Sequence, residues 1–79
     1  MKIFPNPTDG IFTVLLTNNN KDIMLVVADN LGREIFIRNI DKSIEKYQYE
    51  FDLSEYSSGI YFVQIVSSNG TVIKKLSLE

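Results

Sequence analysis

The sequence predicts an all-β fold, a small antiparallel β-sandwich of six or seven strands. Short runs of alternating apolar and polar residues recur along the chain, and clusters of Gly, Asn, Asp and Ser separate them. No stretch repeats apolar residues at the spacing of a packed helix. With 79 residues the chain is expected to form a single domain, residues 1–79, whose small core gives marginal stability.

The composition excludes several kinds of function. The chain has no cysteine and no histidine, which removes disulfides, thiolate chemistry and the commonest general base and metal ligand. The net charge of −2 gives no reason to expect a nucleic-acid or anionic-membrane partner. No apolar run approaches the roughly 18 residues that a spanning helix needs. We therefore expect no cofactor, no nucleic-acid partner and no transmembrane segment.

The first part of the chain predicts a turn followed by strands. Residues 4–10 contain two prolines and an Asp-Gly pair, so they are expected to be extended and then to turn. Residues 11–17 and 23–28 predict strands separated by the polar turn 18–21, and residues 2–4 would add a further strand if they pair. The side chains expected to face the core are Phe12, Val14, Leu16, Ile23, Leu25 and Val27.

The middle of the chain predicts a hairpin and a half-buried strand. Residues 29–32 are expected to form the hairpin loop, with Gly32 in the left-handed conformation, and residues 34–38 the following strand. Residues 39–46 are polar and predict a loop, whereas residues 47–53 alternate cleanly. The apolar side of this last strand comprises Tyr47, Tyr49, Phe51 and Leu53.

The strongest strand signal is the run 59–66, which begins at Gly59 and is apolar on both faces. The Asn69-Gly70 pair predicts a two-residue turn into a final strand. The opposed pairs expected from this turn are Ser67 with Val72, Ile65 with Lys74, Gln64 with Lys75 and Val66 with Ile73. One apolar face should then contain Tyr61, Val63, Ile65, Val72, Leu76 and Leu78. The other face holds Phe62, Val66 and Ile73, which either pack under a loop or form an exposed patch for a partner. Short strands and frequent turns together indicate an immunoglobulin-like form of the sandwich.

The polar residues have simpler explanations than catalysis or metal binding. Ser43 and Ser54 have neither a histidine nor the glycines of a nucleophile elbow. The candidates for a carboxylate pair or a calcium loop are Glu50, Asp52, Asp29, Asn30 and Asp41. Glu50 and Asp52 are explained by the solvated face of one strand. Asp29, Asn30 and Asp41 are explained by turn chemistry, since the spacing of an EF-hand is absent. The sequence therefore supports no enzymatic activity.

The aromatic residues allow two interpretations. They could form a platform on which sugars stack, or they could pack in the core and on the strand surfaces. The residues concerned are Tyr47, Tyr49, Tyr56, Tyr61 and Phe62. Core and surface packing is the favoured interpretation.

Several segments, in their order and spacing, resemble a known family. They are Pro5-Asn6-Pro7 followed by Thr8-Asp9-Gly10, then Asp29-Asn30-Leu31-Gly32, then Asp52-Leu53-Ser54 leading to Gly59-Ile60-Tyr61-Phe62-Val63, and finally Gly70 leading to Lys74-Lys75-Leu76. This ordered set is similar to the type A C-terminal sorting domain of the type IX (Por) secretion system, over nearly the whole chain. The departures are Ala28 and Tyr56, where the family often has an aromatic residue and a leucine, and Leu78-Glu79 beyond the usual ending.

The resemblance implies a sorting signal without catalytic activity. Such domains end exported proteins and direct an N-terminal cargo domain in cis from the periplasm to the cell surface or medium. The implied partners are the type IX translocon, its shuttle components and a sortase-like cysteine protease that removes the domain upstream of the folded part. We accordingly expect the chain to be the terminal domain of a larger secreted protein.

The resemblance also implies which residues take part in recognition. Those assigned to partner recognition are Gly59, Tyr61, Gly70, Val72, Ile73, Lys74, Lys75, Leu76 and Leu78. Those assigned to the structural motifs are Pro5, Asn6, Pro7, Gly10, Asp29 and Gly32. Two alternatives remain open at this point: an immunoglobulin-like module that binds carbohydrate or protein, and a structural spacer domain.

Overall fold

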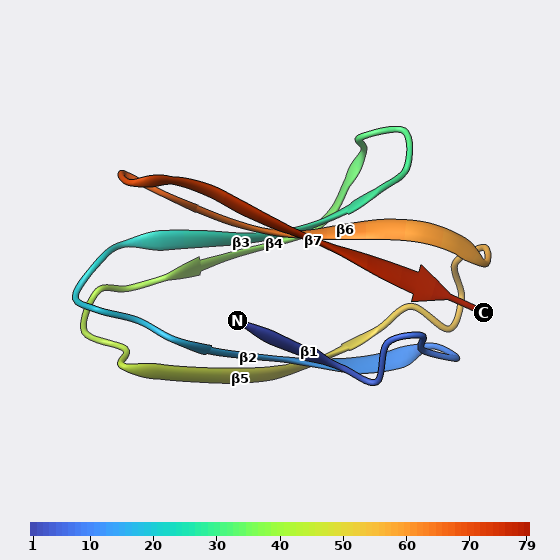
Figure 1. Ribbon diagram of the computed structural model, residues 1–79, viewed down its shortest axis with the longest axis horizontal. Helices are drawn as coiled ribbons and strands as arrows, with labels where there is room; N and C mark the ends of the chain where they lie inside the picture. The colour runs from blue at the N-terminus through green and yellow to red at the C-terminus, as the bar shows by residue number, and fades with distance from the viewer.

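The computed structural model describes residues 1–79, which form seven strands and no helix. The strands are β1 (Lys2–Phe4), β2 (Ile11–Thr17), β3 (Ile23–Asp29), β4 (Glu34–Ile40), β5 (Lys46–Asp52), β6 (Gly59–Ser67) and β7 (Gly70–Leu78). They pack as two antiparallel sheets in the orders β1-β2-β5 and β4-β3-β6-β7 (Figure 1). The predicted antiparallel sandwich is therefore confirmed. Residues 2–4 pair with β2 as strand β1, so the sandwich has seven strands, the larger of the two numbers predicted. No helix long and apolar enough to cross a bilayer is present.

The connections between the strands repeatedly cross from one sheet to the other. The chain passes from β2 to β3, returns from β4 to β5, and crosses again from β5 to β6. At the start of β6 the Tyr61 hydroxyl donates a hydrogen bond of 2.6 Å to the carbonyl of Ser57. A tyrosine that bonds to the backbone a few residues upstream in this way is a hallmark of immunoglobulin-like sandwiches.

The core lies between the two sheets and is built from alternate residues of their strands. All the side chains predicted to face inward from β2 and β3 are buried there. In the β2–β5 register Phe12 lies opposite Phe51, and their rings stack with centroids 5.5 Å apart. Burying large apolar side chains of this kind contributes about 1.5–3 kcal/mol each, which is the main stabilising term in so small a domain.

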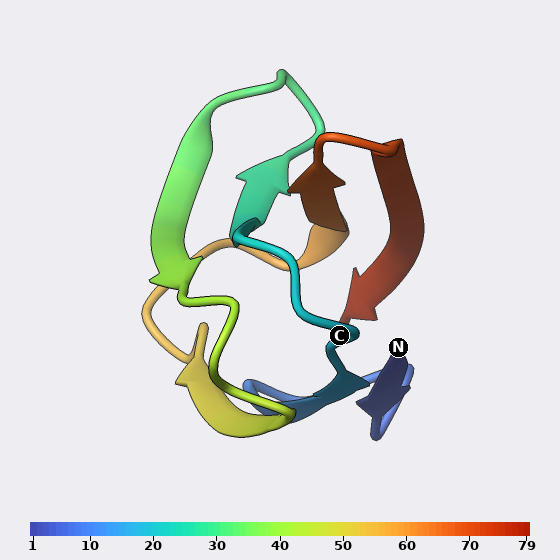
Figure 2. The same ribbon diagram turned by 90° about the vertical axis from the view of Figure 1, so that its left-hand side faces the viewer.

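One side of the sandwich, between the edge strands β4 and β5, is closed by side chains. The rings of Phe36 and Phe51 meet across it with centroids 5.4 Å apart. The Arg38 guanidinium carbon lies 5.4 Å from the Tyr49 ring centroid and 5.7 Å from that of Phe51. Figure 2 shows β4 and β5 on the same side of the molecule. Aromatic contacts and cation–π attraction therefore close this side of the core.

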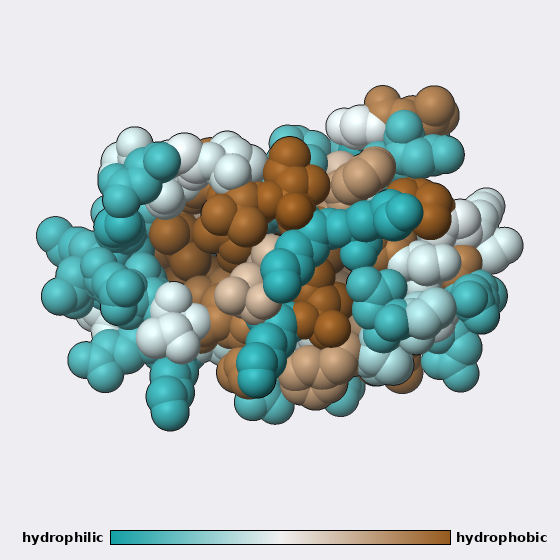
Figure 3. All heavy atoms as spheres, in the orientation of Figure 1, coloured by the Kyte–Doolittle hydropathy of each residue, from teal (hydrophilic) through white to brown (hydrophobic).

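The opposite side, between β7 and β1, is more open. Both strands border it in Figures 1 and 2, and β1 begins near the middle of the molecule and does not extend beneath the β6–β7 hairpin. Met1, Ile3 and Ile65 are only partly buried here, and Val72 is 55% exposed. Figure 3 shows apolar atoms gathered on this side and crossed by hydrophilic side chains. The short length of β1 therefore leaves part of the core edge accessible.

Strand β4 is longer than predicted and carries an irregularity. It extends to Ile40, which is buried in the core, so the predicted loop 39–46 is shorter than expected. The β3–β4 register shifts between Val27 and Ala28, and beyond the shift Phe36 lies opposite Val27 and packs against the core. A bulge inserts an extra residue into one strand and re-aims the side chains next to it. The polar residues of this segment concealed the strand in the sequence.

The predicted register of the β6–β7 hairpin is wrong. Ser67 pairs with Gly70 and not with Val72, so the turn consists of Ser68 and Asn69. The Asn69 N–H bonds the Ser67 hydroxyl at 3.2 Å, and Gly70 has a φ of +122°, the left-handed region that favours glycine. The positive φ of Gly70 therefore lies just after the turn and not within it, so the two-residue turn sits one residue earlier in the chain than predicted.

The corrected register changes every predicted opposed pair but no side-chain face. Lys74 lies opposite Val63, Lys75 opposite Phe62, Ile73 opposite Gln64, Thr71 opposite Val66 and Val72 opposite Ile65. The shift is two residues along β7, and because side chains alternate with period two, each stays on its predicted face.

The two faces of β7 differ from the prediction in burial at one position. Leu76 and Leu78 join the core as expected, but Val72 is exposed because no strand lies beneath the hairpin tip. On the outer face Ile73 is 56% exposed, so it is not packed under a loop. Of the two alternatives for the outer face, an exposed patch is the one that fits Ile73.

Candidate functional site

The residues assigned to recognition fall into a buried and an accessible group. Tyr61, Leu76 and Leu78 lie in the core and hold the ends of β6 and β7 in place. The accessible group is Gly59, Gly70, Val72, Ile73, Lys74 and Lys75. Apart from Gly59, these accessible residues are consecutive or nearly so on the first half of β7. A partner can therefore contact this half of the strand directly, whereas the buried group acts through the fold.

Strand β7 is an edge strand, so alternate backbone groups point away from β6. Ser77 has its N–H and C=O directed outward, because both bond to the N-terminal segment and not to β6. Since outward and inward residues alternate along an antiparallel strand, Thr71, Ile73 and Lys75 also direct their backbone groups outward. β7 thus offers a row of main-chain donors and acceptors along its free edge.

The N-terminal Pro-Asn-Pro segment occupies the last part of this edge. The Asn6 side chain donates from Nδ2 to the Lys75 carbonyl at 2.9 Å and accepts at Oδ1 from the Ser77 N–H at 3.1 Å. Thr8 continues the pairing, since its N–H bonds the Ser77 carbonyl at 2.9 Å and its carbonyl accepts from the Glu79 N–H at 2.8 Å. We call this pairing of Asn6 and Thr8 with residues 75–79 the terminal clasp.

A turn built around Thr8 holds the terminal clasp in position. The buried Thr8 hydroxyl donates to the Ile11 carbonyl at 2.8 Å and accepts from the Gly10 N–H at 3.1 Å. Gly10 lies so close to the following corner that a Cβ placed on it would meet the Ser54 Cβ at 3.2 Å. The prolines Pro5 and Pro7 flank Asn6 and restrict its backbone. Of the motif residues assigned from the sequence, Pro5, Asn6, Pro7 and Gly10 therefore meet in one substructure with the end of β7, whereas Asp29 and Gly32 lie apart, in the β3–β4 hairpin.

The two lysines of β7 point to opposite faces of the sheet and are both exposed. Neither forms an ion pair, and the only ion pair in the structure joins Arg33 to Asp29, with 2.7 Å between Nε and Oδ2. Their ammonium groups are thus free to interact with a partner on either side of the strand.

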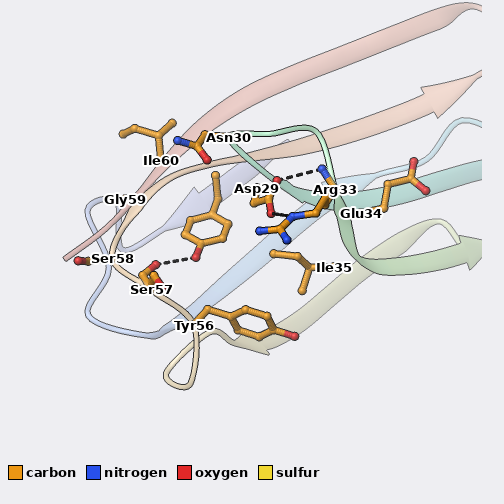
Figure 4. A pocket seen from close by; sticks show the side chains of 11 residues that line it. Asp29, Asn30, Arg33, Glu34, Ile35, Tyr56, Ser57, Ser58, Gly59 and Ile60 are labelled. Carbon is orange, nitrogen blue, oxygen red and sulfur yellow. Dashed lines mark hydrogen bonds and ion pairs between the residues drawn. The ribbon is translucent and has the colours of Figure 1, made fainter.

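A second candidate site is a cleft of about 590 Å³ beside the β3–β4 hairpin (Figure 4). Asp29 organises one wall, since its carboxylate accepts from the N–H groups of Leu31 and Arg33 at 2.9 Å each and pairs with the Arg33 side chain. Gly32 has the predicted left-handed φ of +84°. Residues 56–61 form the other wall, including Gly59 at the start of β6.

Hydrogen bonding explains the carboxylates of the cleft and the turns. Burial raises the pKa of the Asp29 carboxyl, but its hydrogen bonds from Arg33 and Leu31 outweigh this, and the pKa lies below the ordinary value. Hydrogen bonds from Ser43 and Ser54 likewise lower the pKa of Asp41 and Asp52. These aspartates thus serve as turn-forming acceptors. No cluster of three or more His, Cys, Asp or Glu side chains is arranged to hold a metal ion.

The aromatic residues named for a sugar platform divide into a group on the β4–β5 side and two residues that lie elsewhere. Tyr47 and Tyr49 stack on β5 with ring centroids 6.1 Å apart, and Tyr56 meets Phe36 edge-on at 6.2 Å. Tyr61 is buried in the core, and Phe62 lies on the opposite face of β6. Tyr47, Tyr49 and Tyr56 therefore belong to one row of rings on the β4–β5 side, joined through Phe51 and Phe36, whereas Tyr61 and Phe62 lie apart from it.

The terminal clasp is the feature that sequence reasoning missed. Its hydrogen bonds join residues 69 and 71 positions apart, and nothing local in the sequence links Asn6 with Lys75 or Ser77. The sequence linked the two segments only in that Pro5-Asn6-Pro7 and the run from Gly70 to Leu76 both belong to the set of motifs that resembles the family.

The fold and this site define a small immunoglobulin-like sandwich whose accessible polar groups follow one terminal edge strand. Compared with known protein families, residues 2–79 match the secretion system C-terminal sorting domain, and the chain belongs to this family. The family comprises non-catalytic sorting signals of the type IX secretion system, so the domain directs export to the cell surface or the extracellular space. No curated protein matches the chain.

Proposed function

We propose that the exposed half of β7, from Gly70 to Lys75, is the part of this sorting signal that the type IX export machinery binds. In this proposal a shuttle or translocon component contacts the strand on cargo that has already reached the periplasm. After passage through the outer membrane, a sortase-like protease cleaves upstream of the sandwich and removes it. The observation that carries the proposal is the exposed β7 edge, whose first half has both accessible side chains and unpaired backbone groups.

The remaining assigned residues support this half of β7 from within. Leu76 and Leu78 anchor the strand in the core, and the terminal clasp fixes its end against the N-terminal segment. The binding strand is therefore pre-organised, which reduces the conformational entropy lost when a partner binds.

A reporter fusion tests the proposal. Residues 1–79 are placed behind a periplasm-directed reporter in a host with a type IX system, and reporter is measured in the periplasm, on the surface and in the medium. The expected result is reporter on the surface or in the medium. Reporter that remains in the periplasm of a host exporting its own cargo would contradict a sorting function.

Replacing the two lysines separates recognition from folding. Lys74→Ala with Lys75→Ala removes exposed charges and should change the free energy of unfolding by no more than about 0.5 kcal/mol each. We expect this variant to remain folded by circular dichroism and to be exported less efficiently. The matched control is Lys42→Ala with Lys46→Ala, which removes exposed lysines away from β7 and should export normally. Equal export of both variants would place binding on the apolar side chains or the backbone of β7.

A further inference from the structure

The terminal clasp divides the β7 edge into a closed and an open part. Asn6 and Thr8 form hydrogen bonds with the carbonyl of Lys75, with both backbone groups of Ser77 and with the N–H of Glu79. The outward groups that no other residue bonds are the N–H and C=O of Thr71, the N–H and C=O of Ile73, and the N–H of Lys75. The open part therefore runs from Thr71 to Lys75.

The other edges of the two sheets are less suited to accept a strand. β4 carries a bulge, and the side of the sandwich that it shares with β5 is closed by Phe36, Phe51 and Arg38. β1 is only three residues long. β7 has nine residues, and it borders the side where the core edge is accessible.

The charge on the open edge restricts which strand can pair with it. Lys74 and Lys75 stand on opposite faces, and neither has an acidic partner within this chain. Lysines on an edge strand disfavour pairing with a second copy of the same edge. A strand paired with β7 places its side chains directly opposite those of β7 and on the same face. Two adjacent acidic residues would therefore meet the two lysines, one on each face, and apolar neighbours would meet Val72 and Ile73.

From these contacts we infer that the export machinery binds the domain by adding a strand to β7 between Thr71 and Lys75. The added strand belongs to a partner protein and carries two adjacent acidic residues beside apolar ones. It takes its main-chain hydrogen bonds from Thr71, Ile73 and Lys75, and the terminal clasp prevents it from extending further. This inference rests on the proposed function of β7 and specifies the chemistry of its partner.

A proline at an outward-facing position tests the backbone contact. Ile73→Pro removes an N–H that bonds nothing within the domain, and edge strands tolerate proline at such positions. The matched control is Ile73→Ala, which shortens the same side chain but keeps the N–H. Thr71→Pro repeats the test at the other outward residue. Circular dichroism and thermal unfolding establish which variants are folded before export is compared in the reporter fusion.

The expected result is that folded Ile73→Pro or Thr71→Pro lowers exported reporter on the order of tenfold relative to Ile73→Ala. Export equal to that of Ile73→Ala would overturn strand addition, while normal export of the unmodified fusion would leave the sorting function intact. Failure of the unmodified fusion would instead contradict the proposed function itself.

Charge reversal tests the acidic character of the partner strand. Lys74→Glu with Lys75→Glu should reduce export below that of the double alanine variant, because like charges opposed across strands are destabilising. Lys74→Arg with Lys75→Arg keeps both positive charges and should be exported at the level of the unmodified fusion. Export of the double glutamate variant at the unmodified level would overturn the acidic partner strand.

Discussion

Tyr61 stabilises the domain both through its ring and through its hydroxyl. The ring is buried against the core and the hydroxyl closes the corner before β6 by bonding the Ser57 carbonyl. These two contributions can be separated by substitution, since phenylalanine keeps the ring and alanine removes both.

We predict that Tyr61→Ala lowers the free energy of unfolding by about 3–5 kcal/mol, as expected for loss of a large core aromatic. Tyr61→Phe should cost only about 1 kcal/mol, the net value of one hydrogen bond. Chemical denaturation of both variants measures the difference. A loss below about 1 kcal/mol for the alanine variant would contradict the central packing of this ring.

Asp29 makes the stability of the domain dependent on pH. Although burial opposes it, the hydrogen bonds from Arg33 and Leu31 lower the pKa of Asp29 below its ordinary value of 3.8. A carboxyl whose pKa is lower in the folded state contributes stability above its unfolded pKa and loses it as the pH falls through the folded pKa.

We therefore predict that the melting temperature falls on acidification below pH about 4 and that Asp29→Asn weakens this dependence. The substitution keeps an oxygen for the backbone N–H groups but removes the charge that pairs with Arg33. Thermal unfolding followed at several pH values measures the effect. Asp41 and Asp52 share the direction of the pKa shift and should preserve part of the dependence.

At the scale of elements, the alternation of side chains was enough to locate the strands. Residues 11–17 and 59–66 were predicted within one residue of β2 and β6, because their pattern depends only on which residues face a core. The hairpin register was not predictable from the Asn69-Gly70 pair, since Gly70 uses its positive φ after the turn. The bulge in β4 was hidden for a similar reason, because it depends on how two strands fit together.

The candidate site was predictable only in part. The family resemblance identified the segments, and the alternation of β7 placed Leu76 and Leu78 in the core. It did not indicate that Asn6 holds the end of β7, because a single sequence carries no information on contacts between residues 69 or 71 positions apart. The alternation of β7 also placed Val72 in the core, but Val72 is exposed. The sequence could not show this, because β1 is too short to lie beneath Val72 and that becomes apparent only when the two sheets are assembled.

The terminal clasp should stabilise the attachment of β7. We predict that Asn6→Ala lowers the free energy of unfolding by about 1–2 kcal/mol, because both of its side-chain hydrogen bonds are lost at an exposed site. Asn19→Ala is the control, since Asn19 is exposed in a loop whose side-chain hydrogen bonds are made by Asn18. Urea denaturation compares the two variants. Equal stability would show that the backbone pairing of Thr8 alone holds the strand.

At the scale of the whole molecule, both sheets depend on the last strand. Leu76 and Leu78 fill the core between them, and β7 covers one side of Tyr61 and Val63. A domain of this size has a free energy of unfolding near the lower end of the usual range of about 5–15 kcal/mol.

We predict that deleting residues 71–79 unfolds the domain, because the loss of two core leucines together with an entire strand exceeds this reserve. Far-UV circular dichroism and the dispersion of amide resonances measure the outcome. The double alanine variant of Lys74 and Lys75 is the control and should retain the folded spectrum. A folded deletion variant would show that the other six strands are sufficient for the sandwich.

The terminal clasp also governs when the domain can form during synthesis. It pairs residues near the start of the chain with residues 75–79, so the intervening chain must be complete before the pairing exists. Contacts between such distant positions are formed late and slow the folding of small β proteins. A chain that lacks β7 therefore leaves apolar residues of the other strands uncovered, and only a chain that includes residues 75–79 acquires the closed sandwich. The folded domain is in this sense evidence that translation has passed β7.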